Sequence, residues 1–254
     1  MRRFVVIGMV LALFTGGALA GTISDPGARP NDEMLRAAFP EATTIVADSR
    51  GIPSFVSGKL GTLGRGPVAN ESLAYLNSLR KVLKATGTES FVLASEEKDR
   101  LGFAHVKFQE TINGLPVVGA EMVVHSKAGV VVVLNGQFIP DEGMPSQAKL
   151  DSERAFRIAA AEAGIFEGTV LDQPTLTYVA ENGKVYLAWA ARISHDEADM
   201  EVIERLFADA RTGERVALHA ITKQARNRKI YNGNHSDPNN PTLPGTLMFQ
   251  EGAT

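Results

Sequence analysis

Five histidines are the side chains of this 254-residue chain best suited to bind a metal ion or to move a proton near neutral pH. They are His105, His125, His195, His219 and His235. A zinc hydrolase site needs two histidines one helical turn apart, a glutamate beside the first, and a third ligand downstream. None of the five begins an H-E-x-x-H sequence. We therefore expect no metal site with an open position, and no hydrolysis by this chain itself.

Other arrangements of reactive residues are weaker still. His105 and His125 are predicted to face each other across neighbouring strands, but two histidines without carboxylate or thiolate support make a poor metal site. His195 precedes two acidic residues in a predicted hydrophilic loop, and proton transfer there would need a cleft and a poised partner. The sequence has no G-x-S-x-G elbow, no P-loop and no cysteine nucleophile.

Residues 101–138 are predicted to form the element that positions the first two histidines. Asn-Gly at 113–114 and a second turn at 127–129 divide this stretch into three short strands, because Asn-Gly supplies the positive φ angles of a tight hairpin. In the first strand, mixed polar residues alternate with apolar ones: Phe103, His105, Lys107 and Gln109 against Ala104, Val106 and Phe108. The pattern predicts an antiparallel meander with one solvated face.

The third strand of the meander departs from this alternation. Its apolar run consists of Val130, Val131, Val132, Val133 and Leu134. Such a run is typical of a strand that is covered on both faces, or of one whose second face binds a partner. The sequence leaves both interpretations open.

The first residues of the chain have the pattern of a secretory signal peptide. Two arginines precede an apolar run over residues 4–14, and Ala18 and Ala20 form an A-x-A cleavage site. The run is too short to span a bilayer, and no later stretch approaches 18 apolar residues. We expect an exported protein, secreted or periplasmic, with no membrane attachment after cleavage.

Composition narrows the class of partner. Removal of residues 1–20 takes away two of the 26 basic residues and leaves 24 against 29 acidic ones, a net charge of about −5, which disfavours nucleic acid. The chain has no cysteine, so an exported fold must rest on its hydrophobic core or on a partner rather than on disulfides.

The first half of the chain is predicted to contain one long helix before the meander. Leu73, Leu76 and Leu79 recur at helical spacing, with Asn70 as N-cap and Gly87 as the stop. Shorter elements are expected around it: a helix within 31–39, strands at 45–47, 52–56 and 91–93, and a solvated turn at 96–100. The glycines of residues 58–66 lack the strand and helix that frame a dinucleotide loop, so a flexible connection is favoured.

The second half repeats the plan of a helix followed by antiparallel strands. A helix is predicted from a cap at Asp151 or Ser152 through Ala163, with Gly164 as its stop. Strands are predicted at 175–179, 185–193, 203–209 and 215–219, with a loop at 195–199 and turns at 181–183 and 211–213. The fold class is therefore α+β, with two small subdomains, each a helix packed on an antiparallel meander, and irregular terminal segments.

The meander resembles the pro-region module shared by fungalysins and thermolysin-like zinc metallopeptidases, known as the FTP domain. The resemblance rests on G-F-x-H-x-x-F-Q, N-G-L-P-V-V-G-A-E, V-H and N-G-Q-F. The matching positions are Phe103, His105, Gln109, Asn113, Gly114, Pro116, Val117, Gly119, Ala120, His125, Gly129, Asn135 and Gly136.

Two later stretches resemble further parts of the same precursors. L-x-x-E-R-A-F-R-I-A, V-Y-L-A-W-A-A and the turn containing Asp209 and Gly213 resemble a PepSY domain. Residues 226–252 resemble the start of a thermolysin-type catalytic domain. The implied organisation is a signal peptide at 1–20, an N-terminal segment at 21–69, an FTP-like pro-domain at 70–140, a linker at 141–149, a PepSY-like domain at 150–220, and a truncated catalytic domain at 221–254.

The resemblance implies a function as well as a fold. It implies a pro-region that assists the folding of a thermolysin-like zinc metalloendopeptidase and blocks its cleft until processing, with the catalytic domain as partner in cis or in trans. Zinc and calcium would belong to that catalytic domain, and this chain would hold no cofactor. The alternatives are a truncated precursor without independent function and a freestanding inhibitor or binding module.

The resemblance also indicates which residues would contact the protease. The apolar run Val130 to Leu134 offers hydrophobic surface, and a protease cleft accepts extended strands through backbone hydrogen bonds. His219 lies at the end of the last predicted strand, where it would approach the zinc of a zymogen, although an ordinary role for a histidine at the end of a strand is favoured.

Overall fold

The computed structural model describes residues 32–197, 200–225, 229–231 and 247–250. The helices are α1 (Asp32–Ala38), α2 (Val68–Ser78) and α3 (Ser152–Glu162). The strands are β1 (Ala42–Ala47), β2 (Pro53–Thr62), β3 (Glu89–Lys98), β4 (Phe103–Ile112), β5 (Leu115–Lys127), β6 (Val130–Gly136), β7 (Gly168–Val170), β8 (Thr175–Glu181), β9 (Lys184–Glu197), β10 (Met200–Asp209), β11 (Arg215–Ala225), β12 (Lys229–Tyr231) and β13 (Leu247–Gln250). The predicted signal peptide, with Ala18 and Ala20, lies outside the described residues.

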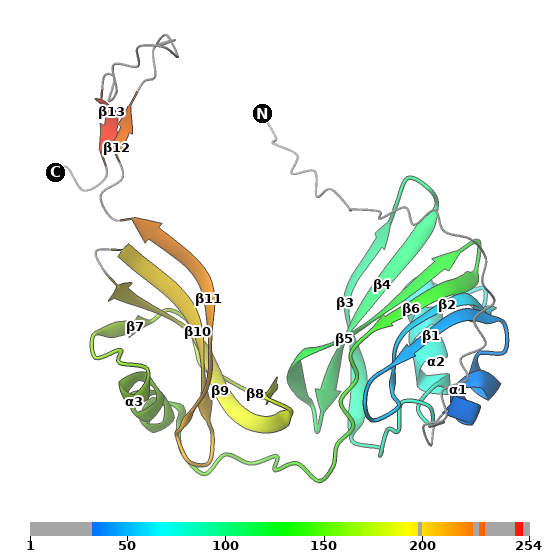
Figure 1. The fold of residues 1–254 in the computed structure, drawn as a ribbon, viewed down its shortest axis with the longest axis horizontal. Coiled ribbons are helices and arrows are strands. Elements are labelled where there is room, and N and C mark those ends of the chain that lie inside the picture. Colours follow the sequence, from blue (N-terminus) through cyan, green and yellow to red (C-terminus); the bar gives the residue numbers. More distant parts are fainter. Residues whose placement is uncertain (1–31, 198–199, 226–228, 232–246, 251–254) are drawn as a thin grey trace.

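Strands β1 to β11 form a single sheet, while β12 and β13 pair separately. The sheet runs β1-β2-β6-β5-β8-β9-β10-β11, with β4 on β5, β3 on β4 and β7 on β9. Figure 1 shows that the strands before residue 140 and those after residue 150 form two halves that meet where β5 approaches β8. We call residues 32–140 the N-terminal half and residues 150–225 the C-terminal half. The predicted α+β class, with a helix on an antiparallel meander in each half, is confirmed.

The two halves are joined by a short parallel pairing between β5 and β8. Its register pairs are Val117 with Tyr178 and Val118 with Val179. Polar contacts reinforce it, because the Thr177 hydroxyl donates to the Pro116 carbonyl at 2.7 Å and the Tyr178 hydroxyl donates to the Pro145 carbonyl at 3.0 Å. Val117 and Tyr178 are fully buried in a shared apolar cluster with Ile112, Ala120, Ile139, Leu187 and Ala210. The junction is thus a small hydrophobic core of its own.

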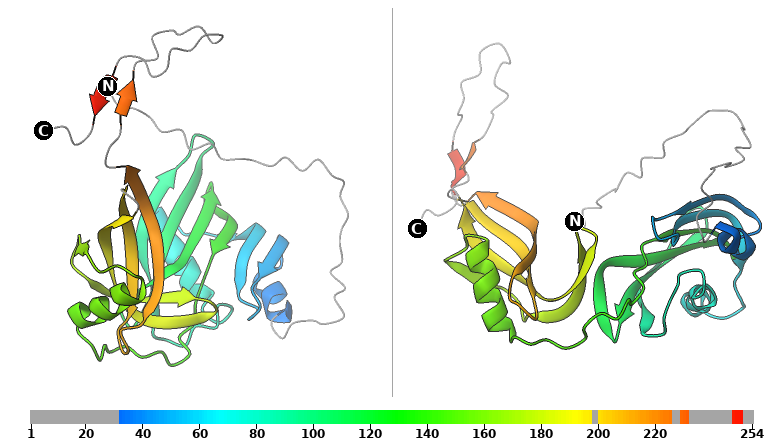
Figure 2. Two further views of the ribbon diagram at one scale, coloured as in Figure 1. Left: turned by 60° about the vertical axis from the view of Figure 1, so that its left-hand side comes forward. Right: turned by 60° about the horizontal axis from the view of Figure 1, so that its bottom comes forward.

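In the N-terminal half, one face of the sheet packs on α1 and α2 (Figure 2). Alternation along β4 puts Val106 and Phe108 into this core, where they meet Leu76 of α2. The predicted helix from Asn70 to Gly87 is wrong at both ends. α2 starts at Val68 with Pro67 as N-cap and no side-chain cap bond, and it ends at Ser78. The remaining apolar residues, Leu79, Val82 and Leu83, are buried from a turn rather than from a helix.

In the C-terminal half, α3 packs on β9, β10 and β11. Asp151 caps the helix, as predicted, and its Oδ1 accepts the Arg154 N–H at 2.8 Å. Small residues permit close packing, since Ala155, Ala159 and Ala208 are fully buried in the same cluster. Trp189 spans this cluster and the junction cluster, and its indole N–H donates to the Leu150 carbonyl at 2.9 Å.

Several predicted loops turned out to be parts of strands. Residues 96–98 of the predicted solvated turn belong to β3, residues 58–62 of the predicted flexible connection belong to β2, and the predicted loop at 195–199 begins inside β9. β11 continues to Ala225, six residues beyond the predicted strand end. Polar residues or glycines suggested loops here, but cross-strand pairing gives these backbones their hydrogen bonds.

The hairpin turns follow the predicted chemistry. Asn113 and Gly114 have φ angles of 52° and 78°, and Ala128 and Gly129 have 49° and 78°. No helix in the described part of the chain is both long enough and apolar enough to cross a membrane.

Candidate functional site

The two histidines of the meander meet on the sheet face opposite α2, which we call the outer face. His105 on β4 lies directly opposite His125 on β5 in the strand register. Their Nδ1 atoms are 2.6 Å apart, and their rings pack edge to face with centroids 4.8 Å apart. The prediction that these histidines face each other across the meander is confirmed.

The other nitrogen of each histidine has its own partner. Nε2 of His105 lies 3.2 Å from Oδ2 of Asp99, and Nε2 of His125 lies 2.7 Å from Oδ1 of Asn135. Asp99 is held in place by the Phe103 N–H, which donates to its Oδ1 at 2.9 Å. The result is a polar row across the outer face, from Asp99 through the two imidazoles to Asn135.

The surroundings of the row favour the neutral form of His125. Burial lowers the pKa of His125, and the neighbouring His105 lowers it further, against the opposing effect of the Asn135 hydrogen bond. Phe103 stacks near His105, and the Lys127 ammonium lies 4.5 Å from the centre of the Phe103 ring. Within the described residues, no three or more His, Cys, Asp or Glu side chains gather around a common point that could hold a metal ion.

Most other residues of the meander motif shape the backbone. The Gln109 amide donates to three carbonyls, those of Glu110, Val117 and Ala120, at 2.7 to 3.1 Å, and so holds the irregular part of β5 that contains Gly119. Gly136 has a φ of 140°, and a Cβ there would collide with the Glu121 carbonyl oxygen. These positions demand particular residues for structural reasons.

The apolar run in β6 divides between core and surface. Val131 and Leu134 are buried in the N-terminal core, whereas Val130, Val132 and Val133 are half-buried. The strand is also flanked on both sides, by β5 and β2. Only part of the predicted protease-contact run is therefore accessible.

His219 lies inside β11 rather than at its end, half-exposed on the edge of the sheet. Its ring packs edge-on to Phe207 with centroids 5.0 Å apart, and its Nε2 is 3.9 Å from Oε2 of Glu181. The Asp209 carboxylate accepts hydrogen bonds from the Arg211 and Thr212 N–H groups and so shapes the turn between β10 and β11. The structure separates His219 from the meander histidines, since they belong to different halves.

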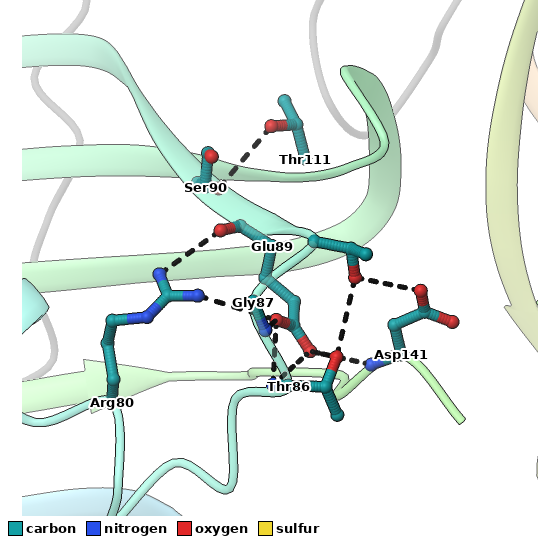
Figure 3. Close-up of polar contacts among 8 residues, drawn as sticks. Arg80, Thr86, Gly87, Glu89, Ser90, Thr111 and Asp141 are labelled. Atoms are coloured by element: carbon teal, nitrogen blue, oxygen red, sulfur yellow. Dashed lines mark hydrogen bonds and ion pairs between the residues drawn. The ribbon is translucent and has the colours of Figure 1, made fainter. Parts of the chain in front are cut away.

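A buried carboxylate network, which the sequence did not reveal, ties the start of β3 to the chain leaving β6 (Figure 3). Glu89 is 1% exposed, and its carboxylate accepts the Thr86, Gly87 and Asp141 N–H groups at 2.8 to 3.1 Å. Arg80 lies 3.5 Å away and also donates to the Glu89 carbonyl. Burial alone would raise the pKa of Glu89, but these backbone hydrogen bonds lower it below its ordinary value.

The pKa of Glu110, on the neighbouring strand β4, is shifted in the opposite direction. Its side chain is fully buried, its Oε2 accepts the Ile139 N–H at 2.9 Å, and its Oε1 has no hydrogen-bond partner in the part of the chain described. Burial raises the pKa of Glu110 to about 8. The protonated, neutral form of this carboxyl therefore predominates at pH 7. The sequence signal was present but weak: Glu110 falls on the apolar side of the alternation in β4.

The C-terminal half contains a partly buried histidine–glutamate pair and an apolar pocket. His195 and Glu204 contact each other at 2.8 Å between β9 and β10, and each side chain is 13% exposed. A pocket of about 600 Å³ lies beside α3, lined by Phe156, Ile165, Ile193 and Leu206 among others. Neither feature holds the third group that a hydrolytic site would need.

Comparison with known proteins points to protease precursors. Residues 89–138, from β3 to just after β6, match the Fungalysin/Thermolysin Propeptide Motif. The chain is 31% identical to the thermostable neutral protease NprT of Geobacillus stearothermophilus over 138 residues, which are 52% of this chain and 24% of that protein. It is 30% identical to thermolysin of Alicyclobacillus acidocaldarius subsp. acidocaldarius over 139 residues, again 52% and 24%.

Two further proteins also match this chain. Bacillolysin of Bacillus amyloliquefaciens is 27% identical over 150 residues, or 55% of this chain and 29% of that protein. The Bacillus megaterium YpeB C-terminal domain matches with 14% identity and a TM-score of 0.34, over 67% of this chain and 72% of that one. The chain spans about a quarter of the length of the proteases it matches, and it is similar to the pro-region of thermolysin-like precursors. The resemblance of the meander to the propeptide motif is confirmed, while the PepSY and catalytic-domain resemblances stay predictions.

Proposed function

We propose that this chain is an exported pro-region that assists the folding of a thermolysin-like zinc metalloendopeptidase and blocks its cleft, in cis or in trans, until it is cleaved. The observation that carries the proposal is the match of the propeptide motif to β3–β6, the four strands that contain the outer-face histidines. In this proposal the C-terminal half is a PepSY-like domain, and zinc and calcium belong to the protease domain. The protein is secreted or periplasmic.

The edge of the C-terminal half supplies the first contact surface. β11 hydrogen-bonds to β10 on one side, and no strand within the described residues pairs with its other side. An unpaired strand edge offers a row of backbone donors and acceptors to an extended partner, as in β-strand addition. His219 lies on this edge and half of its side chain is exposed, so its imidazole is available to a partner.

The outer face supplies the second contact surface. Val133 lies opposite His125 in the register and is half-buried, and on β2 the side chain of Phe55, opposite Asn135, is 39% exposed. Burying such partly exposed apolar side chains under a partner gains about 25 cal/mol per Å². Val131 and Leu134 take no part, because the core already covers them.

The test is titration of a mature thermolysin-like protease with the full exported chain, following hydrolysis of a peptide substrate. We expect inhibition at micromolar or lower concentration that fades as the protease cleaves the chain. Val133→Ser should weaken inhibition about threefold to tenfold, since one half-buried valine contributes on the order of 1 kcal/mol. Val170→Ser, at a valine of the C-terminal half that is 46% exposed, is the matched control and should change nothing.

The outcomes separate the alternatives. Absence of inhibition against any such protease, including one encoded nearby, would favour a truncated precursor without independent function. Stable inhibition with no cleavage of the chain would favour a freestanding inhibitor. Equal effects of Val133→Ser and Val170→Ser would remove the outer face from the contact surface.

A further inference from the structure

Beyond the proposed function, and independently of it, we propose that His105 and His125 form a surface binding site for a divalent transition-metal ion. The two Nδ1 atoms are the protein ligands, and Cu²⁺ is the preferred metal. The chemistry is that of two cis imidazole ligands on one face of a sheet. The remaining coordination positions belong to water.

The hydrogen bonds on the far side of each ring determine where the protons sit. Nε2 of His105 faces a carboxylate oxygen of Asp99, and Nε2 of His125 faces the amide oxygen of Asn135. Both partner atoms accept hydrogen bonds only, so each Nε2 carries a proton, and in a neutral ring the Nδ1 atom then keeps a free lone pair. Metal-binding histidines are oriented in this way, with the second ring nitrogen donating to a carboxylate or a carbonyl.

The two free lone pairs then require a cation between them. The Nδ1 atoms are 2.6 Å apart, and two unprotonated nitrogens at that distance repel each other. A metal ion bound to both nitrogens removes this repulsion. A single proton shared between the two Nδ1 atoms does the same without any change at Asn135, so the metal ion must displace that proton.

The distance between the nitrogens also selects among metals. With metal–nitrogen bonds of about 2.0 to 2.1 Å, a separation of 2.6 Å gives an N–metal–N angle of roughly 80°. That angle is close to the 90° between neighbouring ligands in a tetragonal site, and far from the tetrahedral angle that zinc prefers. Opening the pair by about 0.3 Å gives the ideal tetragonal angle. Tetragonal nitrogen sites suit Cu²⁺ and Ni²⁺, and Cu²⁺ binds more tightly of the two.

Neighbouring charges permit a cation here. The Asp99 carboxylate lies at one end of the row, and Glu97 is opposite His105 in the strand register. The nearby lysines are engaged elsewhere, Lys107 with Glu121 at 3.0 Å and Lys127 over the Phe103 ring. His105 keeps a third of its side chain exposed, so water can complete the coordination. With two protein ligands, the site binds more weakly than a four-ligand structural site.

Titration of the full exported chain with Cu²⁺, followed by calorimetry and electron paramagnetic resonance, tests the proposal. We expect one equivalent bound with a tetragonal spectrum and coupling to two nitrogens. His105→Gln and His125→Gln should each weaken binding at least tenfold, whereas the matched control His219→Gln should leave it unchanged. Asn135→Asp should bind at least as tightly as the natural chain, because an aspartate can only accept the His125 proton.

Each remaining result contradicts the proposal. Absence of binding, or binding that all three histidine variants weaken equally, would show that the pair holds only a shared proton. Loss of binding in Asn135→Asp would also contradict the proposal, because a carboxylate should orient the His125 ring for metal binding at least as well as the amide oxygen does. Thermal melting without metal identifies any variant that fails to fold, and His105→Gln, at a side chain that is one-third exposed, is the variant expected to keep the fold.

Discussion

Each half of the sheet packs a helix on antiparallel strands, but the two hydrophobic cores differ in composition. In the N-terminal half, the core contains buried polar groups, among them Glu89, Glu110 and Ser72. In the C-terminal half, the buried side chains of the described residues are apolar except for Thr177, and many of them are alanines. One half therefore contains buried carboxyl groups that accept backbone hydrogen bonds, and the other relies on close packing of small side chains.

This difference shows where pH should act on the molecule. The carboxyls of Glu89 and Glu110 accept the backbone N–H groups of Asp141 and Ile139, at the start of the connection between the halves. Their protonation states thus bear on the segment that leads from β6 to the C-terminal half. The alanine core of α3 has no ionisable group to respond.

The largest expected effect comes from Glu110. Its pKa is about 8 in the folded chain and near its ordinary value, 4.5, in the unfolded chain. Between these pH values the unfolded state binds fewer protons, so the stability that is complete below pH 4.5 falls by roughly 4 to 5 kcal/mol as the pH rises through 8. Glu110→Gln should remove this loss. Urea unfolding at pH 5, 7 and 9 measures it.

Glu96→Gln is the matched control for that experiment, because Glu96 is an exposed glutamate on the adjacent strand β3. It should keep the pH slope of the natural chain. The same slope in Glu110→Gln and in the natural chain would mean that Glu110 ionises normally and that the contrast between the halves is wrong.

A smaller effect is expected from Glu89, at any pH above its lowered pKa. Glu89→Leu leaves the Thr86, Gly87 and Asp141 N–H groups without their acceptor, and it leaves Arg80 with the residue-89 backbone carbonyl but no carboxylate. Each buried unpaired group costs about 1 to 3 kcal/mol, so the total loss should be about 3 kcal/mol or more. The urea midpoint should fall for unfolding of the N-terminal half, while Glu96→Gln should leave it in place. A neutral Glu89→Leu would contradict the importance of the network.

The smallest effect compares the two helix starts. Asp151→Ala removes the cap of α3 and should cost about 1 kcal/mol of unfolding free energy. Asn70→Ala, at the position where the sequence predicts the cap of α2, should be neutral or slightly stabilising, because the structure places Asn70 inside the helix and exposed. Equal destabilisation by both substitutions, measured by thermal melting, would show that Asn70 caps α2 as the sequence predicts.

These cases show what the sequence could and could not predict. Alternation in β4 and Asn-Gly turn chemistry are local, so the meander and the facing of His105 and His125 could be predicted from neighbouring residues. The α2 start could not, because the glycine stretch before it is anchored by Glu71, whose carboxylate accepts the Gly64 and Gly66 N–H groups. That contact leaves no trace in local propensity.

The candidate contact residues and the carboxylate network also depend on contacts between distant parts of the sequence. Val131 and Leu134 belong to the predicted protease-contact run, yet the N-terminal core buries both side chains. The carboxylate network joins residues more than 50 positions apart, such as Glu89 and Asp141. The parallel pairing of β5 with β8 likewise joins segments that show no complementarity in sequence, so one sheet emerges where the sequence indicates two separate units.

The most direct test of the central claim, that this chain is a pro-region for a thermolysin-like protease, is refolding of a denatured protease domain without its own pro-region. The measurement is the recovered hydrolytic activity, after the added chain has been degraded, with the full exported chain or with an unrelated exported protein at the same concentration. A pro-region should raise the recovered activity at least tenfold, in proportion to its concentration up to one equivalent. Equal recovery with both proteins, for every thermolysin-like domain tried, would contradict the account.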